Sequence, residues 1–178
     1  MSSPPMSRPR ILRALKGLGD ELQRRGVRGE VFIVGGAAMA LAYSSRRSTR
    51  DVDAIFEPKA IMYEAARSVA EHQGLPEDWL NDAVKAFAPG KDPNSRRIFS
   101  TASLEVAAAS PEYLLAMKLL ASRVDQDVED IRTLYRLCRF KTSDEGLALV
   151  RRFYPRRKLE PKIRLLLEEL YGPSTSMG

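Results

Sequence analysis

The stretch 34-VGGAAMALAYSSRRSTRDVDAIF-56 contains the features that decide the fold. An apolar run ends at two glycines, a helix of small residues follows, and an arginine-rich loop leads into a second apolar run that carries Asp51 and Asp53. Aspartate is a poor strand former and is costly to bury without a partner. Two aspartates in an otherwise apolar strand therefore predict a site that uses them.

The spacing of the aspartates indicates what that site binds. Side chains two positions apart on a strand face the same side, so Asp51 and Asp53 are expected to project together. Adjacent carboxylates repel unless a cation lies between them. Hard oxygen ligands favour Mg²⁺ or Mn²⁺, and Mg²⁺ commonly takes substrate phosphates as further ligands. The pair predicts a metal site with Asp51 and Asp53 as ligands.

The residues before the aspartates supply groups that bind phosphate. Glycines allow a backbone to approach a ligand closely, and the N-terminus of a helix presents free amides. Guanidinium and hydroxyl groups from the following loop offer further hydrogen bonds to a triphosphate. A Gly-Gly turn, an Asp-x-Asp pair or a basic loop is usually unremarkable by itself, but their succession favours a nucleotide–metal site. The candidate nucleotide-binding residues are Gly35, Gly36, Arg46, Ser48 and Thr49.

Composition excludes several other classes of site. The 178 residues include one cysteine, Cys138, and one histidine, His72. These are too few for a disulfide framework, a zinc site built on cysteines or a site with several histidines. A reducing cytoplasm fits best. Apolar runs are too short for a membrane span, and the N-terminal 1-MSSPPMSRPR-10 is expected to be a flexible lead-in. The net charge of +6 is compatible with RNA or DNA as a partner, or with solubility alone.

Hydrophobic periodicity predicts an α+β fold in which a small mixed β-sheet with flanking helices is followed by a helical C-terminal part. We expect a core of mixed sheet and helices at 1–109 and a helical lobe packed on it at 110–178, with a soft boundary. The segment 77–87 is expected to be helical or irregular, and the tail 172–178 disordered. The expected helices are 9–25, 37–43, 59–72, 111–123, 125–139, 143–153 and 159–171, and the expected strands are 31–35, 51–56, 97–101 and 103–109, the last two as a hairpin.

A second polar group follows Pro111. In one unbroken helix, nine residues at about 100° each would leave Lys118 and Asp127 on opposite faces. Asp125 is a good N-cap candidate, so a break is expected near Val124, with a new helix that brings Asp127 and Asp130 back to one side. Alternatively, Lys118 is a snorkelling surface lysine and the acidic residues stabilise the first helical turn.

These motifs resemble the polymerase-β-type nucleotidyltransferase superfamily, in which a Gly-Gly or Gly-Ser turn opens a helix and an Asp-x-Asp strand follows. Within it, the chain is most similar to the AbiEii-like branch, which includes the MenT-type toxins. The run 111-PEYLLAMKLLASRVDQDVEDI-131 resembles that branch's second block, and 78-DWLND-82 resembles a segment of uncharacterised relatives. The resemblance covers about residues 30 to 131.

The resemblance implies roles for further residues. Lys118 would contact the triphosphate, and Asp127, with Asp130 behind it, would complete the acidic site or position the acceptor. Many superfamily members carry a third metal-binding carboxylate on a later strand, for which Glu105 is the alternative to Asp127. Asn81 and Trp79 of the 78–82 segment would pack over a base or order the loop, with core packing favoured for Trp79.

The resemblance also implies an activity. An NMP from ATP or another NTP would be moved to an acceptor hydroxyl, with the 3′ end of tRNA as the favoured acceptor. The setting would be a toxin–antitoxin pair that blocks translation, with a small antitoxin protein as a partner. The basic pairs Arg151–Arg152 and Arg156–Arg157 are candidate RNA backbone contacts. Transfer to a protein or a small molecule, and a non-catalytic nucleotide-binding module, remain alternatives.

Overall fold

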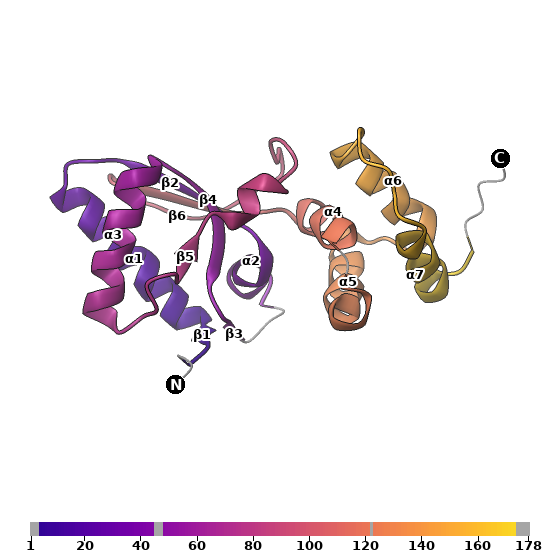
Figure 1. Ribbon diagram of the computed structural model, residues 1–178, viewed down its shortest axis with the longest axis horizontal. Coiled ribbons are helices and arrows are strands. Elements are labelled where there is room, and N and C mark those ends of the chain that lie inside the picture. Colours follow the sequence, from indigo (N-terminus) through magenta and orange to yellow (C-terminus); the bar gives the residue numbers. More distant parts are fainter. Residues whose placement is uncertain (1–3, 45–47, 122, 174–178) are drawn as a thin grey trace. The chain divides into compact units, whose positions relative to one another are not determined.

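The computed structural model describes residues 4–44, 48–121 and 123–173, and the chain divides into two compact units. Unit 1 comprises residues 1–86 and 94–109, and unit 2 comprises residues 87–93 and 110–178. Among the described residues, seven α-helices, one five-stranded sheet and one two-stranded sheet form the α+β class that the sequence predicts (Figure 1). Whether the two units are separate domains stays a prediction.

The five-stranded sheet of unit 1 has the strand order β5-β4-β2-β7-β6. β2 is antiparallel to β4 and parallel to β7, while β4 is parallel to β5. β6 and β7 form the predicted antiparallel hairpin. The strands are β2 (Gly29–Ile33), β4 (Val52–Glu57), β5 (Leu80–Asn81), β6 (Arg96–Ser100) and β7 (Leu104–Ala108).

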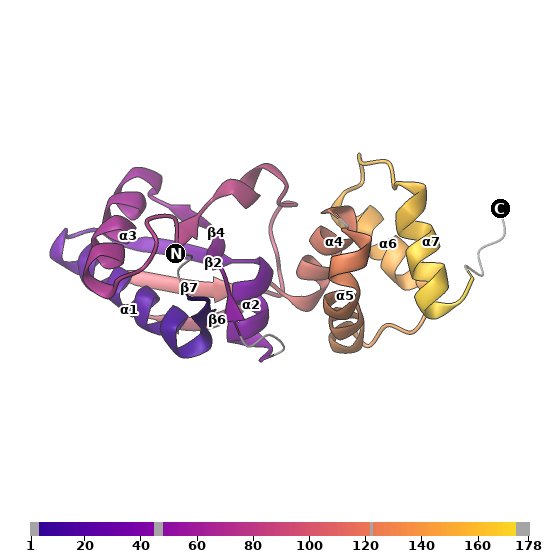
Figure 2. The same ribbon diagram turned by 60° about the horizontal axis from the view of Figure 1, so that its bottom comes forward.

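One face of this sheet is covered by two helices, α1 (Arg8–Arg24) and α3 (Lys59–Gln73), which Figure 2 shows on the same side. The apolar stripe of α1 is fully buried because its members recur at helical spacing. On β4, Val52, Ala54 and Phe56 face these helices and are buried. Asp53, Ile55 and Glu57 alternate with them and lie on the opposite, less covered face.

Two shorter strands lie beside the helix that follows β2. β1 (Met6–Ser7) pairs antiparallel with β3 (Ser48–Thr49), and α2 (Gly35–Ala42) contacts β3 and β4. The prediction of a flexible lead-in is wrong for Met6, which is only 1% exposed. A single apolar residue among polar ones carries no periodic signal, so its burial depends on the rest of the unit. Residues 1–3 lie outside the described chain.

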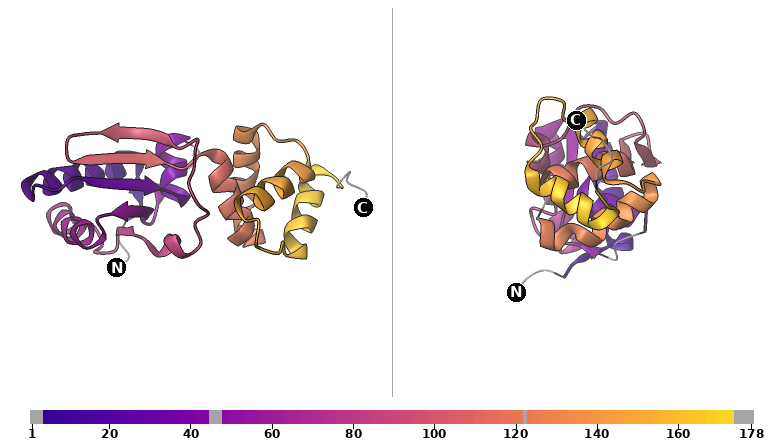
Figure 3. Two further views of the ribbon diagram at one scale, coloured as in Figure 1. Left: turned by 90° about the horizontal axis from the view of Figure 1, so that it is seen from above. Right: turned by 90° about the vertical axis from the view of Figure 1, so that its right-hand side faces the viewer.

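Unit 2 contains four helices, drawn from orange to yellow in Figure 3. They confirm the four helices predicted after Ser110: α4 (Pro111–Ala121), α5 (Val124–Cys138), α6 (Ser143–Phe153) and α7 (Pro161–Tyr171). Tyr135 of α5 stacks on Tyr171 of α7, with ring centroids 3.9 Å apart. At the start of α6, Thr142 and Glu145 form a capping box, which satisfies amides that the first helical turn leaves unpaired.

The segment between α3 and β6 is mostly irregular, as predicted, with β5 and a short 3₁₀ helix, η1 (Ala83–Ala86). Of the tail predicted to be disordered, 172–178, residues 174–178 lie outside the described residues, while the Gly172 amide donates to the Glu168 carbonyl at 2.9 Å and so continues from α7. Within the described ranges, none of the helices combines the length and the apolar character that crossing a bilayer requires.

Candidate nucleotide and metal site

Asp53 lies where β2 ends and α2 begins. The Val34 amide donates to the backbone carbonyl of Asp53 at 2.9 Å, which joins the end of β2 to β4. Gly35 follows with φ +62°, in the left-handed region that favours glycine. A Cβ added at Gly35 would lie 3.2 Å from Asp53 Oδ2. Glycine at position 35 thus allows both the turn and the close approach of the carboxylate.

The N-terminus of α2 begins at the same turn. Its N-cap residue, Val34, has an apolar side chain and provides no capping hydrogen bond. The amides of Gly35 and Gly36 belong to the first turn, where the N–H groups have no acceptor within the helix. Such amides, together with the helix dipole, favour an anionic ligand. The predicted phosphate-binding role of Gly35 and Gly36 is therefore compatible with their position.

Asn81 lies beside the two aspartates. β5 pairs with β4 in a register that places Asn81 opposite Asp53, and the Val52 amide donates to the Trp79 carbonyl at 2.7 Å. Asn81 Nδ2 donates to Asp51 Oδ2 at 3.3 Å. The structure therefore brings Asp51, Asp53 and Asn81 to one edge of unit 1, as the sequence predicts for the aspartates.

The other residues of the 78–82 segment fix this arrangement. Trp79 is fully buried and its Nε1 donates to the Ala66 carbonyl at 2.9 Å, which confirms core packing. Asp82 forms an ion pair with Lys59 at 2.7 Å and accepts a hydrogen bond from the Tyr63 hydroxyl. Anchors on both sides of Asn81 hold β5 against β4, so the asparagine amide stays beside Asp51.

Burial and nearby negative charge destabilise the ionised form of both aspartates. Burial, the largest cause, raises the pKa of both the Asp51 and the Asp53 carboxyl above their usual value. The charge of Asp78 raises the pKa of Asp51 further, and the charge of Asp51 raises that of Asp53. Hydrogen bonds from Asn81 oppose both shifts, and Arg50 opposes the shift of Asp51. A bound cation would stabilise both ionised carboxylates.

Asp78 is an acidic neighbour of Asp51 that the sequence did not single out. It is exposed and directly precedes Trp79. Its influence on Asp51 depends on how β5 pairs with β4, and neither its spacing nor its neighbours in sequence indicate that pairing.

The donor set fits Mg²⁺ or Mn²⁺ as a two-carboxylate site. In the part of the chain that the structure describes, no group of three or more histidine, cysteine, aspartate or glutamate residues is arranged to hold a metal. Mg²⁺ is often bound by one or two carboxylates and completes its octahedron with water and substrate phosphates. Asp51 and Asp53 meet that requirement without a third carboxylate.

Two of the predicted nucleotide-binding residues of the loop, Ser48 and Thr49, form strand β3. Both lie half-buried, and Thr49 Oγ1 donates to the backbone carbonyl of Asp51 at 3.1 Å. This bond orders the approach to β4, and a role in nucleotide binding stays a prediction for both residues. Arg46 lies outside the described residues.

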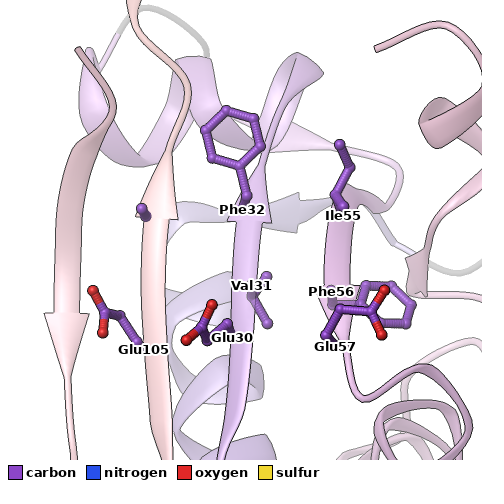
Figure 4. A pocket seen from close by; sticks show the side chains of 8 residues that line it. Glu30, Val31, Phe32, Ile55, Phe56, Glu57 and Glu105 are labelled. Carbon is purple, nitrogen blue, oxygen red and sulfur yellow. The ribbon is translucent and has the colours of Figure 1, made fainter. Parts of the chain in front are cut away.

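Glu105 does not lie beside the aspartates, which corrects the suggestion that it supplies a third carboxylate there. Glu105 pairs with Glu30, which precedes Val34 by four residues, and the Val34 amide is hydrogen-bonded to Asp53. Four residues of a strand separate the level of Glu105 from that of Asp53 by about 13 Å. Figure 4 shows Glu105 and Glu30 together on the less covered face. The Glu105 carboxylate pairs with Arg28 at 3.3 Å and Arg97 at 3.6 Å. The strand was predicted correctly, but its register cannot be read from one sequence.

A second polar cluster lies within unit 2. Lys118 Nζ lies 2.8 Å from Asp127 Oδ1 and 2.9 Å from Asp130 Oδ2, and all three side chains are at most 25% exposed. We call these three residues the Lys118 cluster. The predicted break between two helices is confirmed, because α4 ends at Ala121 and α5 begins at Val124. The break lets a lysine and two aspartates that one continuous helix would separate come together.

The predicted N-cap at this break is wrong. The N-cap of α5 is Arg123, and Asp125 lies inside the helix. The Asp127 carboxylate instead accepts a hydrogen bond from the Arg123 amide at 3.3 Å. Asp127 thus stabilises the start of α5 as well as pairing with Lys118. Residue type alone does not distinguish Asp125 from Asp127 as the aspartate that binds an amide at the start of α5.

Comparison with known families identifies the chain's relatives. Residues 11–138, more than half of the chain, match the family described as "nucleotidyltransferase of unknown function (DUF6036)". The matched range includes Asp51, Asp53 and the Lys118 cluster. The comparison does not confirm the AbiEii-like or MenT-type branch. No curated protein and no solved structure matches the chain. The chain belongs to this nucleotidyltransferase family.

Proposed function

We propose that this protein is a metal-dependent nucleotidyltransferase that moves NMP from an NTP to an acceptor hydroxyl. The observation that carries the proposal is the meeting of three features in unit 1: Asp53 on β4 with Asp51 directly before that strand, the glycine turn against Asp53, and the first-turn amides of α2. Membership of a nucleotidyltransferase family supports the same chemistry.

Asp51 and Asp53 would hold the metal, Mg²⁺ or Mn²⁺. When bound, such an ion supplies positive charge to the nucleotide phosphates and lowers the pKa of the attacking hydroxyl. The raised pKa values of both carboxyls support the assignment, because a bound cation stabilises the ionised form that burial and neighbouring negative charge disfavour. Asn81 orients Asp51 through its amide, so the carboxylate needs little rearrangement when a ligand binds.

The backbone amides of Gly35 and Gly36 would bind the triphosphate. In the transfer step, the acceptor oxygen forms a bond to the α-phosphorus, the bond between the α-phosphorus and the bridging oxygen breaks, and pyrophosphate leaves with that oxygen. Fixed donors at the N-terminus of α2 would stabilise the charge on the phosphate oxygens during this exchange. The absence of a side chain at Gly35 allows the Asp53 carboxylate to approach the start of α2 closely.

The Lys118 cluster takes part in this proposal through the resemblance, which gives Lys118 a triphosphate contact and Asp127 and Asp130 a role in the acidic site or acceptor positioning. The structure supports a lysine held in place by two carboxylates within unit 2. Substitution of Lys118 tests whether it takes part in nucleotide transfer.

We further propose the 3′ end of tRNA as the acceptor, and a toxin–antitoxin pair that blocks translation as the setting. This finer proposal rests on the resemblance to the AbiEii-like branch and on the net charge of +6. Transfer to a protein hydroxyl or a small molecule uses the same aspartates, and a non-catalytic module would only bind the nucleotide.

A labelling experiment tests the proposal. The protein is incubated with each of the four α-³²P-labelled NTPs, Mg²⁺ and unfractionated tRNA, with EDTA and the Asp51→Ala variant as controls. We expect label on tRNA for at least one NTP, and none with EDTA or Asp51→Ala. Label on protein alone would replace tRNA by a protein acceptor. Nucleotide binding without transfer to tRNA, protein or added small molecules would contradict the enzymatic proposal.

A further inference from the structure

The positive charge of the chain is concentrated in one short segment of unit 2. Between residues 151 and 164, seven residues are lysine or arginine and one is glutamate, which gives this segment a charge of +6. The whole chain has the same formal net charge, so all the other residues together sum to zero. We call residues 151–164 the basic segment; its cations are Arg151, Arg152, Arg156, Arg157, Lys158, Lys162 and Arg164.

These cations are presented on an ordered surface. They occupy the end of α6, the connection and the start of α7, which pack against each other within unit 2 (Figure 3), and all seven are exposed. Tyr154 fixes the connection, because its hydroxyl donates to the Phe87 carbonyl at 2.8 Å and its own carbonyl accepts from the Arg157 amide at 3.1 Å. The arginines therefore project from a folded turn.

Few of these cations are neutralised by the protein itself. Lys162 pairs with Glu160 at 3.0 Å, and Arg164 lies 3.8 Å from Glu168. Among the residues that the structure describes, Arg151, Arg156 and Arg157 form no ion pair. A solvated surface that serves only solubility usually intersperses both signs, which weakens its field. An unbalanced cluster raises the local concentration of anionic ligands.

We propose that the basic segment binds the phosphate backbone of RNA. Five of its seven cations are arginines, whose planar guanidinium groups form paired hydrogen bonds with phosphate oxygens. An anionic membrane is a poorer fit, because an interfacial helix needs an apolar face for the bilayer. On α7, Ile163, Leu166 and Leu167 are buried in unit 2, and only Leu165 is exposed as a large apolar residue.

This inference rests on the proposed function for the choice of RNA, and it assigns the acceptor's backbone contacts to specific residues. It is nonetheless separable from catalysis, because RNA binding can be measured without transfer. The Asp51→Asn variant, which lacks one proposed metal ligand, is the natural background for that measurement.

The experiment measures fluorescence anisotropy of labelled tRNA with Asp51→Asn protein between 50 and 300 mM KCl. The test variant adds Arg151→Gln, Arg156→Gln and Arg157→Gln. Its matched control adds Arg13→Gln, Lys16→Gln and Arg67→Gln, which removes the same charge from exposed positions on α1 and α3. Circular dichroism melting of both variants checks that they fold.

We expect the test variant to bind tRNA at least about tenfold more weakly at low salt, with a slope of log K against log salt smaller by about 2 to 3. The control is expected to stay within about twofold of its parent. Equal weakening in both variants would overturn the proposal, since it would show only a net-charge effect. Binding to phosphatidylserine vesicles but not to tRNA would also overturn it, in favour of a membrane surface.

The outcomes also separate this inference from the proposed function. If the test variant loses tRNA binding while the native protein labels only protein, the surface assignment holds and the tRNA acceptor fails. In the opposite outcome, the native protein labels tRNA, and the three arginine substitutions, made in the otherwise native protein, leave both labelling and tRNA binding unchanged. In that case tRNA stands as the acceptor and the basic segment is excluded as its binding surface.

Discussion

The two acidic groups of this protein solve the same electrostatic problem in opposite ways. In unit 2, Asp127 and Asp130 share the ammonium group of Lys118, with both distances below 3 Å. In unit 1, Asp51 and Asp53 are held by the neutral amide of Asn81, and among the described residues neither forms an ion pair with a lysine or arginine. The first group carries its own counterion, whereas for the second we propose a metal ion as the counterion.

This difference supports the proposal of a ligand site at Asp51 and Asp53, whereas Asp127 and Asp130 are paired within the chain. Buried carboxylates without a counterion cost stability, and proteins retain such groups mainly where function uses them. The raised pKa values of Asp51 and Asp53 are the sign of that cost. The Lys118 cluster would instead contribute to the stability of unit 2, whatever its part in transfer.

The largest expected effect is on transfer. Asp53→Asn keeps the shape of the side chain but removes a charge that would hold the metal, so we expect nucleotide transfer to fall by at least about 10²-fold. Glu105→Gln is the matched control, because it removes a carboxylate from the same face of the same sheet. Initial rates of label transfer at saturating Mg²⁺ measure both. A loss with Glu105→Gln equal to that with Asp53→Asn would break the contrast and restore Glu105 as a metal ligand.

The sequence predicted the parts of this contrast that depend on local patterns. The strand carrying Asp53 and the glycine turn follow from spacing and from the conformational freedom of glycine. The helix break before α5 was predicted in the right place, but from an N-cap at Asp125 that the structure does not have. The burial of Trp79 follows from its large apolar side chain.

What the sequence did not predict depends on tertiary pairing. The register of β7 separates Glu105 from Asp53, and the pairing of β5 with β4 brings Asp78 and Asn81 to Asp51. A one-residue change of register would exchange the two faces of a strand, and only packing against α1 and α3 decides between them. The cap of α5 was also missed, because Asp127 reaches back from one turn further on.

The second expected effect is on the free energy of unfolding, and it tests the ion pairs of the Lys118 cluster in unit 2. Lys118→Met leaves two mostly buried aspartates without their shared counterion, so we expect the free energy of unfolding to fall by about 2 kcal/mol. Lys162→Met is the control, because its pair with Glu160 is exposed and is expected to contribute less than about 0.5 kcal/mol. Urea denaturation followed by circular dichroism measures both.

The double variants test whether the loss arises within the cluster. Asp127→Asn and Asp130→Asn are each combined with Lys118→Met. Each substitution removes one of the two unpaired charges, so part of the lost stability should return in each double variant. Equal stability of Lys118→Met and the native protein would show that the ion pairs are without consequence for folding. Lys118 would then retain only the role that the resemblance gives it.

The smallest effect is a pH dependence that arises in unit 1. The carboxyl pKa of Asp53 is raised in the folded protein above its usual 3.8, first by burial and then by the charge of Asp51. The folded state therefore binds more protons than the unfolded state between these two pKa values, and stability falls as the pH rises through that window.

The Asp53→Asn variant has no carboxyl at this position to titrate. We expect its melting temperature to match that of the native protein below pH 3.8 and to exceed it increasingly at higher pH, when both are measured in EDTA. The difference between the two proteins cancels the titration of groups away from the site. Asp51 contributes through its charge beside Asp53, and Asp78 and Arg50 act on Asp51. Saturating Mg²⁺ should reverse the order near neutral pH, because the ion binds the native folded state and stabilises it. A native protein that is the more stable of the two in EDTA at pH 7 would mean that Asp53 already has a counterion within the chain, and the contrast with the Lys118 cluster would disappear.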